Sequence, residues 1–310
     1  MFSGRLFIDG KDAYGEYGAV VVEGGYNELV SYPPLKPVPF NDWHEEDGIE
    51  ADLSSPMLDN RKADIEFAFL DRTGFANLVA DLQRTVYHQF DARSIGRKWT
   101  LRVTAHTGLT VVKGDAFLST FSVVEDEPYD MYKYSPPIGS TIADDGYSID
   151  GRSLSEYGAR VLKGSLESVM RVPSVKESLM VDKRQANGVL YDSGDNIRLK
   201  SKDVTVHMLI SGGDLGYVWT CYDALLHDLI KPGERQLYID SIGESFPCYY
   251  KSSKVVGFYP NSRIWLQFDV TLVFTKFRLG DMAYLLLSDE DGALVVREED
   301  DTAYIQVIRL

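Results

Sequence analysis

The sequence contains little cysteine and little histidine. Cys221 and Cys248 are the only cysteines among 310 residues, and five histidines are spread along the chain. Two cysteines cannot build the disulfide framework of a small secreted domain, and their spacing does not match a zinc signature. No two histidines have the H-x-x-x-H spacing of a helical zinc site. We therefore expect two buried thiols, no metal site and no cofactor.

Long apolar runs and catalytic signatures are also missing. No apolar run approaches the roughly 18–20 residues that span a membrane, so no membrane span is expected. The sequence does not begin with a basic segment followed by an apolar one, so no secretory signal is expected. G-x-S-x-G, P-loop and G-x-G-x-x-G motifs are absent. The sequence therefore predicts a protein that is not an enzyme, although 47 acidic residues leave a carboxylate pair for glycoside cleavage open.

Positive charge is scarce as well. The chain has 32 lysines and arginines against 47 acidic residues, which gives a formal net charge of -15. A protein that binds duplex nucleic acid needs clustered basic side chains to neutralise phosphates, so specific nucleic-acid binding is not expected. A hydrophobic content of 44% is typical of a globular protein. At roughly 150 residues per domain, the length predicts about two domains.

What the sequence does contain is a repeated opening. Ile-Asp-Gly occurs at 8–10 and again at 149–151, and Glu-Tyr-Gly-Ala follows each copy, at 16–19 and at 156–159. An acid and a tyrosine suggest a ligand site, but Asp-Gly also favours a turn, and both copies keep these residues where others have drifted. We interpret the motif as structural or as part of an interface in both copies. Its residues are Ile8, Asp9, Gly10, Tyr17, Gly18, Ile149, Asp150, Gly151, Tyr157 and Gly158.

The elements that follow each opening come in the same order. Alternating apolar residues predict strands over 63–70 and 202–210, and helical spacing predicts amphipathic helices over 73–90 and 212–230. Further strands are predicted at 99–105 and, as its counterpart, 235–241. Residues 246–277 predict three strands, with turns at 252–253 and 260–261. Apolar residues on the predicted faces are Ile65, Phe67, Phe69, Val204, Val206 and Met208 in the strands, and Phe75, Leu78, Val79, Leu82, Val86, Phe90, Leu215, Val218, Tyr222, Leu225, Leu226 and Leu229 in the helices.

These elements predict an α+β, mostly β protein. It has two tandem homologous β-sandwich or barrel domains, each with one flanking helix, and a C-terminal β-hairpin element. The domains are expected at 1–128 and 147–278, with a proline-containing linker at 129–146 and the hairpin extension at 279–310.

Two acidic segments leave an ion site open. "DWHEEDG" at 42–48 places a histidine among four acids, but it lacks the spacing of a calcium loop and is interpreted as a solvated turn. "SDEDG" at 288–292 is interpreted as the turn of the C-terminal hairpin.

The order of motifs resembles a known family. Ile-Asp-Gly with Tyr-Gly-Ala, the segment at 33–56 with its W-x-x-x-D-G at 43–48, and a strand, helix and strands after it resemble the distal-tail and tail-tube-like domains of tailed bacteriophages. Two such domains in one chain resemble baseplate hub proteins of the same family. In the second copy the W-x-x-x-D-G pattern is reduced to Gly188. The resemblance implies a β-sandwich or barrel with a flanking helix, six copies of which form a ring around a tail channel.

The resemblance implies a structural component of a phage or prophage tail tip or baseplate. Such a protein would form a homo-oligomeric ring, either a hexamer or a trimer with pseudo-six-fold symmetry. Its partners would be itself and other tail proteins (tube, hub or fibre), and it would be assembled in the bacterial cytoplasm and located in the virion. The alternative is a non-catalytic two-domain β-sandwich module that binds carbohydrate or a cell surface. The tryptophans occupy non-matching places in the two copies, which disfavours a repeated sugar platform: Trp43, Trp99, Trp219 and Trp265.

Overall fold

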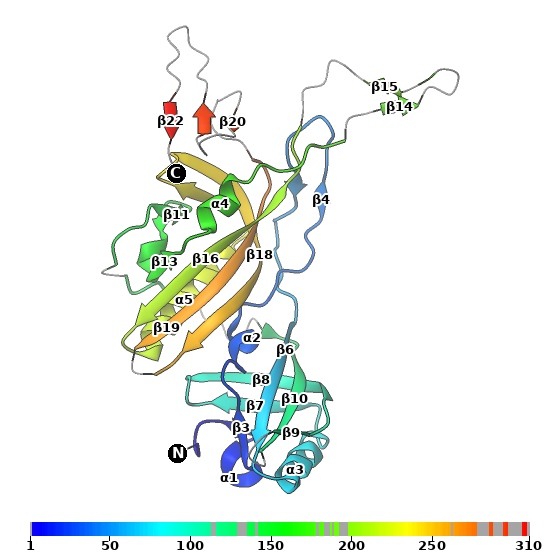
Figure 1. The fold of residues 1–310 in the computed structure, drawn as a ribbon, viewed down its shortest axis with the longest axis vertical. Coiled ribbons are helices and arrows are strands. Elements are labelled where there is room, and N and C mark those ends of the chain that lie inside the picture. The colour runs from blue at the N-terminus through cyan, green and yellow to red at the C-terminus, as the bar shows by residue number, and fades with distance from the viewer. Residues whose placement is uncertain are drawn as a thin grey trace.

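The computed structural model describes most of the chain. The described residues are 2–112, 116–128, 135–139, 142–177, 180–182, 187, 189–191, 198–261, 263–277, 285–287, 294–296 and 306–308. We call residues 1–128 the first half and residues 147–278 the second half. Each half contains one large antiparallel sheet, and the two halves follow one another along the long axis of the molecule (Figure 1).

The sheet of the first half has eight strands. Its order is β2-β1-β7-β8-β10-β6-β3, with β9 paired to β10 outside this path. Side chains on β6 alternate between buried and partly exposed, as predicted, because one face of the sheet covers the core. The strands are β1 (Phe7–Ile8), β2 (Lys11–Asp12), β3 (Ala19–Val21), β6 (Arg61–Phe69), β7 (Tyr87–Ala92), β8 (Arg97–His106), β9 (Thr110–Val112) and β10 (Ala116–Glu125).

Three helices accompany this sheet: α1 (Ala13–Tyr17), α2 (Asn27–Val30) and α3 (Arg72–Leu82). The carboxylate of Asp71 caps α3 by accepting the Gly74 N–H at 2.7 Å. The prediction that this helix continues to Phe90 is wrong. Val86 is 62% exposed, and Phe90 lies on β7 between β1 and β8. Residues 87–92 alternate in burial with a period of two, and pairing with two neighbouring strands overrides the apolar spacing that resembles a helix.

The sheet of the second half has seven strands in the order β12-β11-β17-β18-β19-β16-β13. Replacing each strand by its counterpart reproduces the path of the first sheet. The strands are β11 (Tyr147–Ile149), β12 (Arg152–Ser153), β13 (Ala159–Val161), β16 (Lys202–Gly212), β17 (Arg235–Ile239), β18 (Glu244–Tyr259) and β19 (Ile264–Phe274). Val204, Val206 and Met208 are buried on one face of β16, as predicted.

The helical elements of the second half are η2 (Leu154–Tyr157), α4 (Ser165–Met170) and α5 (Leu215–Leu229). The predicted apolar face of α5 is confirmed, since Val218, Tyr222, Leu225, Leu226 and Leu229 are buried. Asp214 caps α5 as Asp71 caps α3, with the Tyr217 N–H at 3.0 Å. Cys221 on this helix and Cys248 on β18 are free and buried, as expected, and burial raises the pKa of the Cys248 thiol to about 12.

Two predictions about the second half are wrong. Residues 246–277 form two strands rather than three, because β18 continues through Ser252-Ser253 with a bulge at Lys251 instead of a turn. The strand at 235–241 is the counterpart of β7, not of the strand at 99–105, which lies in β8. This error follows from the helix predicted over 73–90, because that helix includes most of β7.

Smaller sheets complete the described structure. They are the hairpin of β4 (Phe40–Asn41) and β5 (Glu50–Ala51), the hairpin of β14 (Met180–Asp182) and β15 (Val189–Tyr191), and a sheet of β20 (Leu285–Leu287), β21 (Leu294–Val296) and β22 (Gln306–Ile308). The turn at 289–292, residues 129–134 of the linker, and Gly188 lie outside the described residues. The α+β, mostly β fold class is confirmed. Within the described ranges no helix is both long and apolar enough to cross a membrane.

A substitution at Gly74 tests the packing of α3 on α1. A Cβ atom at this position would lie 1.9 Å from the carbonyl oxygen of Tyr17, so the two helices cannot keep their separation. We expect Gly74→Ala to lower the free energy of unfolding by about 2 kcal/mol or more, measured by urea denaturation. Gly108→Ala is the matched control, because a Cβ there meets nothing within 4 Å. Equal stability of the two variants would contradict the close approach.

Candidate functional site

The repeated Ile-Asp-Gly motif forms the same hairpin turn in each half. Asp9 and Gly10 connect β1 to β2 with φ angles of 51° and 80°, and Asp150 and Gly151 connect β11 to β12 with φ angles of 52° and 79°. Positive φ at both central residues is the requirement of a type I′ turn, which Asp-Gly satisfies best. Asp9 and Asp150 are the only residues other than glycine with positive φ in the described part of the chain.

Each motif aspartate also ties its turn to a neighbouring strand. The Asp9 carboxylate accepts the Gln89 N–H at 2.8 Å and lies 2.6 Å from Nδ1 of His88. The Asp150 carboxylate accepts the Gln236 N–H at 2.8 Å and an N–H of Arg235 at 2.7 Å. Both carboxylates are therefore occupied by contacts within their own half.

The two basic partners act alike although their chemistry differs. Nε2 of buried His88 faces the carbonyl oxygens of Leu82 and Thr85 at 3.0 and 3.1 Å. Arg235 donates in the same way to the carbonyls of Pro232 and Gly233. Oxygen atoms face both ring nitrogens of His88. Each basic side chain thus joins the motif aspartate to the end of the helix that precedes the next strand.

The Glu-Tyr-Gly-Ala motif fixes the first helix of each half to the long helix. Tyr17 donates its hydroxyl to Asp81 on α3 at 2.7 Å, and Tyr157 donates to Asp228 on α5. Burial raises the pKa of both phenols, and the carboxylates add to the rise. The glycines end these helices in left-handed conformation, Gly18 with φ 58° and Gly158 with φ 64°.

A basic residue on the strand after each turn, β2 or β12, also contacts the aspartate that the tyrosine binds. Lys11 lies 2.6 Å from the carboxylate of Asp81, and Arg152 lies 3.1 Å from that of Asp228. The ten motif residues lie in the β1–β2 and β11–β12 hairpins and in the short helices that follow them, including the glycines that end these helices. The polar contacts described for the motif stay inside each half. The interface role expected for these residues stays a prediction.

The acidic segment 42–48 has a function that the sequence did not reveal. It is the tip of the β4–β5 hairpin and lies against the second half, beside which Figure 1 shows β4. Asp47 accepts the Leu199 N–H at 2.8 Å, and Lys176 contacts the Asp42 carboxylate at 2.5 Å. The interpretation as a solvated turn fits residues 42–46, which are exposed, and is wrong for Asp47, whose side chain is 13% exposed. Among the described residues no cluster of three or more histidine, cysteine or acidic side chains is placed to hold a metal ion, and 288–292 lie outside them.

Gly48 allows this tip to approach the second half at backbone distance. Its N–H donates to the carbonyl of Leu199 at 2.7 Å, and the Ile49 N–H donates to the carbonyl of Thr275 at 2.9 Å. A Cβ at Gly48 would lie 1.6 Å from the Thr275 oxygen, and its φ of 74° also favours glycine. The W-x-x-x-D-G pattern of the first half is thus the sequence of a contact between the halves.

An aromatic pair lies at the centre of the junction between the halves. The rings of Tyr32 and Tyr222 stack at 4.0 Å between centroids, and both residues are fully buried. Tyr32 donates its hydroxyl to the carbonyl of Tyr222, and Tyr222 donates to the carbonyl of Val30 at 3.1 Å. Each phenol therefore has a hydrogen-bond acceptor in the opposite half, which offsets the cost of burying it.

A partly buried ion pair lies at the edge of the same junction. Arg97 at the start of β8 makes two hydrogen bonds to Asp223 on α5, at 3.0 and 2.6 Å. The guanidinium also lies 4.1 Å from the ring centroid of Trp219, whose indole N–H donates to the Ile95 carbonyl at 2.7 Å. Burial raises the pKa of Asp223, and Arg97 opposes that rise.

A second ion pair, which is buried, connects Arg61 on β6 with Glu125 on β10. The Arg61 guanidinium also donates to the carbonyl of Ser31 at 2.8 Å, in the segment that enters the junction. Burial raises the pKa of Glu125 despite this partner. The pair positions the guanidinium that binds the incoming segment at Ser31.

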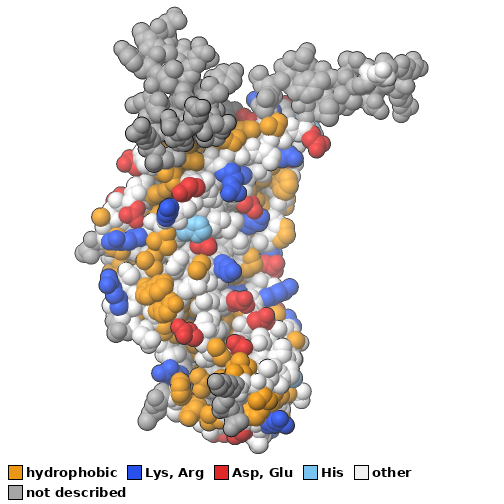
Figure 2. All heavy atoms as spheres, in the orientation of Figure 1, with side chains coloured by type: hydrophobic (Ala, Val, Ile, Leu, Met, Phe, Trp, Pro, Cys, Tyr) orange, Lys and Arg blue, Asp and Glu red, His pale blue; other side chains and the backbone are white. Residues whose placement is uncertain are grey.

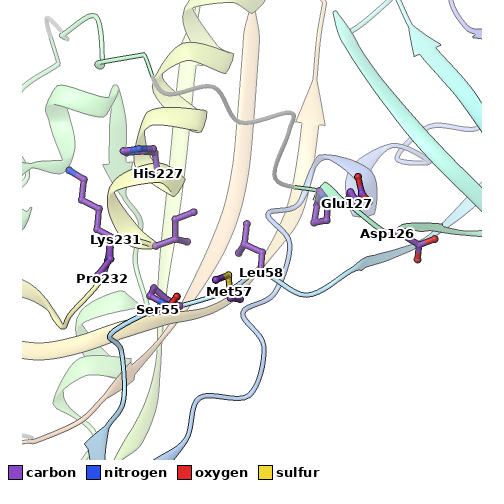
Figure 3. Close-up of a pocket in the computed structure, with 11 residues that line it drawn as sticks. Ser55, Met57, Leu58, Asp126, Glu127, His227, Lys231 and Pro232 are labelled. Carbon is purple, nitrogen blue, oxygen red and sulfur yellow. The ribbon is translucent and has the colours of Figure 1, made fainter.

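A cavity of about 620 Å³ opens between the halves (Figure 3). Met57 and Leu58 line it from the first half, and His227, Ile230 and Lys231 line it from the end of α5. The remaining lining residues are Ser55, Pro56, Asp126, Glu127, Pro128 and Pro232. Its walls are mainly apolar, with charged side chains around them.

Two charged residues of this cavity, Asp126 and Lys231, are engaged in ion pairs. Arg102 holds Asp126 with two hydrogen bonds of 2.8 and 2.9 Å, which lower the pKa of that carboxyl. Lys231 lies 2.6 Å from Asp228. These pairs stabilise the surface around the cavity, and the arrangement favours packing of an apolar segment over acid–base chemistry.

Comparisons with known proteins give matches among solved structures alone. No family model and no curated protein matches the chain. The chain is similar to the crystal structure of the SPP1 Dit (gp 19.1) protein, described as a paradigm of the hub adsorption apparatus in Gram-positive infecting phages. The match covers 88% of this chain and 99% of that chain, with 13% sequence identity and a TM-score of 0.31. At this identity and TM-score, the match carries no inference about what this chain does.

Sequence reasoning missed the residues that join the halves. Tyr32, Arg97, Tyr222 and Asp223 lie far apart along the chain, and none belongs to the repeated motif. Tyr222 was expected on the apolar face of its helix but not at a junction. The one local signal is Pro33-Pro34 after Tyr32, which indicates an extended segment leaving the first sheet.

The ion pair between Arg97 and Asp223 gives a test of the junction. We expect Arg97→Ala to lower the free energy of unfolding by about 2 kcal/mol, because the partly buried carboxylate of Asp223 loses its partner. Arg84→Ala is the control: its pair with Asp81 is at the surface, with Arg84 72% exposed, and its loss costs less than about 1 kcal/mol. Denaturation in urea measures both, and similar losses would show that the junction does not depend on this pair.

Proposed function

We propose that the protein is a structural component of the tail tip or baseplate of a phage or prophage, where it forms a closed ring around the tail channel. The observation that carries this proposal is the repetition of one sheet order in the two halves of a single chain. The resemblance of the Ile-Asp-Gly, Tyr-Gly-Ala and W-x-x-x-D-G motifs to distal-tail and tail-tube-like domains supports the assignment to a tail.

The junction between the halves supports assembly into a ring. It joins two like units through different surfaces, since the segment after α2 of the first half packs on β18 and α5 of the second. A contact of this kind between like units is heterologous, so each unit presents one surface to the next. Repetition of such contacts closes into a ring when the rotation between units permits it.

Two stoichiometries fit a chain with two units. Three chains would supply six like units and give pseudo-six-fold symmetry, and six chains would form a hexamer with two layers or twice as many units in the ring. The partners would be neighbouring tube, hub or fibre proteins, with assembly in the bacterial cytoplasm before incorporation into the virion. The net charge of -15 suits a channel that does not retain DNA, because like charges repel the phosphates.

The distribution of aromatic side chains supports this role over carbohydrate binding. Trp99 and Trp219 are buried, and the ring of Trp265 stacks on Tyr259 at 4.1 Å. Trp43 is 52% exposed, but its indole N–H is directed at Glu50 in the contact hairpin. On the face shown in Figure 2, basic and acidic side chains are interspersed and hydrophobic ones gather over both halves, a composition suited to protein contacts.

The ring is tested by the mass of the assembled protein. For a chain of 34.9 kDa, we expect light scattering after size exclusion to give a discrete species of three or six chains, and negative-stain images to show a ring with a central opening. The chain as a stable monomer at high protein concentration would contradict the proposal. Binding to a glycan array without oligomer formation would favour the carbohydrate-binding alternative.

A further inference from the structure

The contact made by residues 31–35 inside the chain is well defined. The Tyr32 N–H donates to Oγ of Ser253 at 2.9 Å, and the Leu35 N–H donates to the carbonyl of Lys251 at 2.9 Å. Lys251 is the bulged residue of β18, whose carbonyl is turned toward the incoming segment. Tyr32 is 2% exposed in this contact. The first half therefore docks through an extended segment that follows α2.

The second half has a counterpart of this segment after α4, at residues 171–175. Val175 forms an isolated bridge with Leu199, as Leu35 does with Leu58 in the first half. The flanking backbone hydrogen bonds also correspond. The Lys176 N–H donates to the carbonyl of Arg198, as the Lys36 N–H donates to the carbonyl of Met57. The two segments thus share both position and backbone pairing.

The exposure of the two segments is opposite. Val172 and Val175 are 54% and 52% exposed, although they occupy the places of buried Tyr32 and half-buried Leu35. The hydrogen bonds to the strand of Leu199 are made by the neighbours of Val175, so the Val175 N–H is directed away from that strand. The Leu35 N–H is directed away from the strand of Leu58 in the same way, and there it donates to Lys251. Two exposed apolar side chains on one short segment and an outward N–H make this a surface suited to a partner.

The receiving surface also has a counterpart, on β8 of the first half. Pairing of β8 with β10 shifts register at Thr104, just as pairing of β18 with β19 shifts at Lys251. Thr104 is therefore the bulged residue that corresponds to Lys251. Thr104, Ala105 and His106 are exposed, so this surface of β8 is open in the chain.

We propose that residues 171–175 of one copy dock on Thr104–His106 of β8 in a second copy of the chain. The docking repeats between chains the contact that residues 31–35 make with β18 inside the chain, with the Val175 N–H donating to the carbonyl of Thr104. The proposal rests on the proposed ring and names the surfaces that close it. The partner is a second copy because the two exposed surfaces are the counterparts of two surfaces that already bind each other inside the chain, residues 31–35 and β18.

Charge substitution on the docking segment tests the contact. We expect the double variant Val172→Asp, Val175→Asp to elute as folded single chains of 34.9 kDa where the unmodified protein forms the ring. Circular dichroism checks that the variant is folded, as expected for substitutions at exposed positions. Val111→Asp is the matched control, because Val111 is a 60% exposed valine on β9, a strand without a counterpart in the second half. A ring retained by the double variant, or lost equally in the control, would overturn the docking.

Cross-linking identifies the two surfaces directly. Both native cysteines are buried, so Val175→Cys and Thr104→Cys introduce accessible thiols. We expect a short bis-maleimide to give covalent dimers when the two single variants are mixed, and none with either variant alone. Absence of dimers from the mixture, in a protein that still forms rings, would overturn the docking and leave the ring intact. An unmodified protein that stays monomeric would instead overturn the proposed ring itself.

Discussion

The stacked pair of Tyr32 and Tyr222 is the contact on which the arrangement of the molecule depends. Burying two phenols is favourable only where each hydroxyl finds an acceptor, and both acceptors here are backbone carbonyls of the opposite half. The geometry is therefore fixed by backbone positions as well as by packing. The Arg97–Asp223 pair at the edge and the Gly48 contact at the hairpin tip hold the same orientation from two other directions. Together these contacts connect the two sheets through backbone hydrogen bonds, ring stacking and an ion pair.

The repeated motif has a different role, inside each half. Asp9 and Asp150 adopt positive φ, accept a backbone N–H and contact a basic side chain, His88 or Arg235, that also contacts the end of the long helix. One residue thus sets the turn, the neighbouring strand and the helix terminus. This explains why the motif persists in both halves while its side-chain partner differs, histidine in one and arginine in the other. Both partners place a ring or guanidinium nitrogen at the same position beside the motif aspartate.

The sequence predicted what local pattern controls. The faces of β6 and β16, the extent of α5 and the burial of both cysteines follow from periodicity and hydrophobicity. It did not predict where α3 ends, because apolar residues at 86 and 90 fit a helix as well as a strand until β1 and β8 are known to pair there. Ser252-Ser253 likewise fits a turn until β18 is known to pair with β19 on both sides of the bulge at Lys251. The contacts between the halves could not be predicted, since residues such as Arg97 and Asp223 have no local signal for each other.

The covalent connection between the halves has a kinetic consequence for any ring built from this chain. The junction inside the chain forms at an effective concentration set by the connection, not by the amount of protein in solution. Every second junction of the ring is then made during folding, and only the others depend on collisions between chains. Assembly would begin from preformed pairs of units, with fewer intermediates than separate units would require. A chain with two like halves would therefore have formed half of the ring's junctions before it meets another copy.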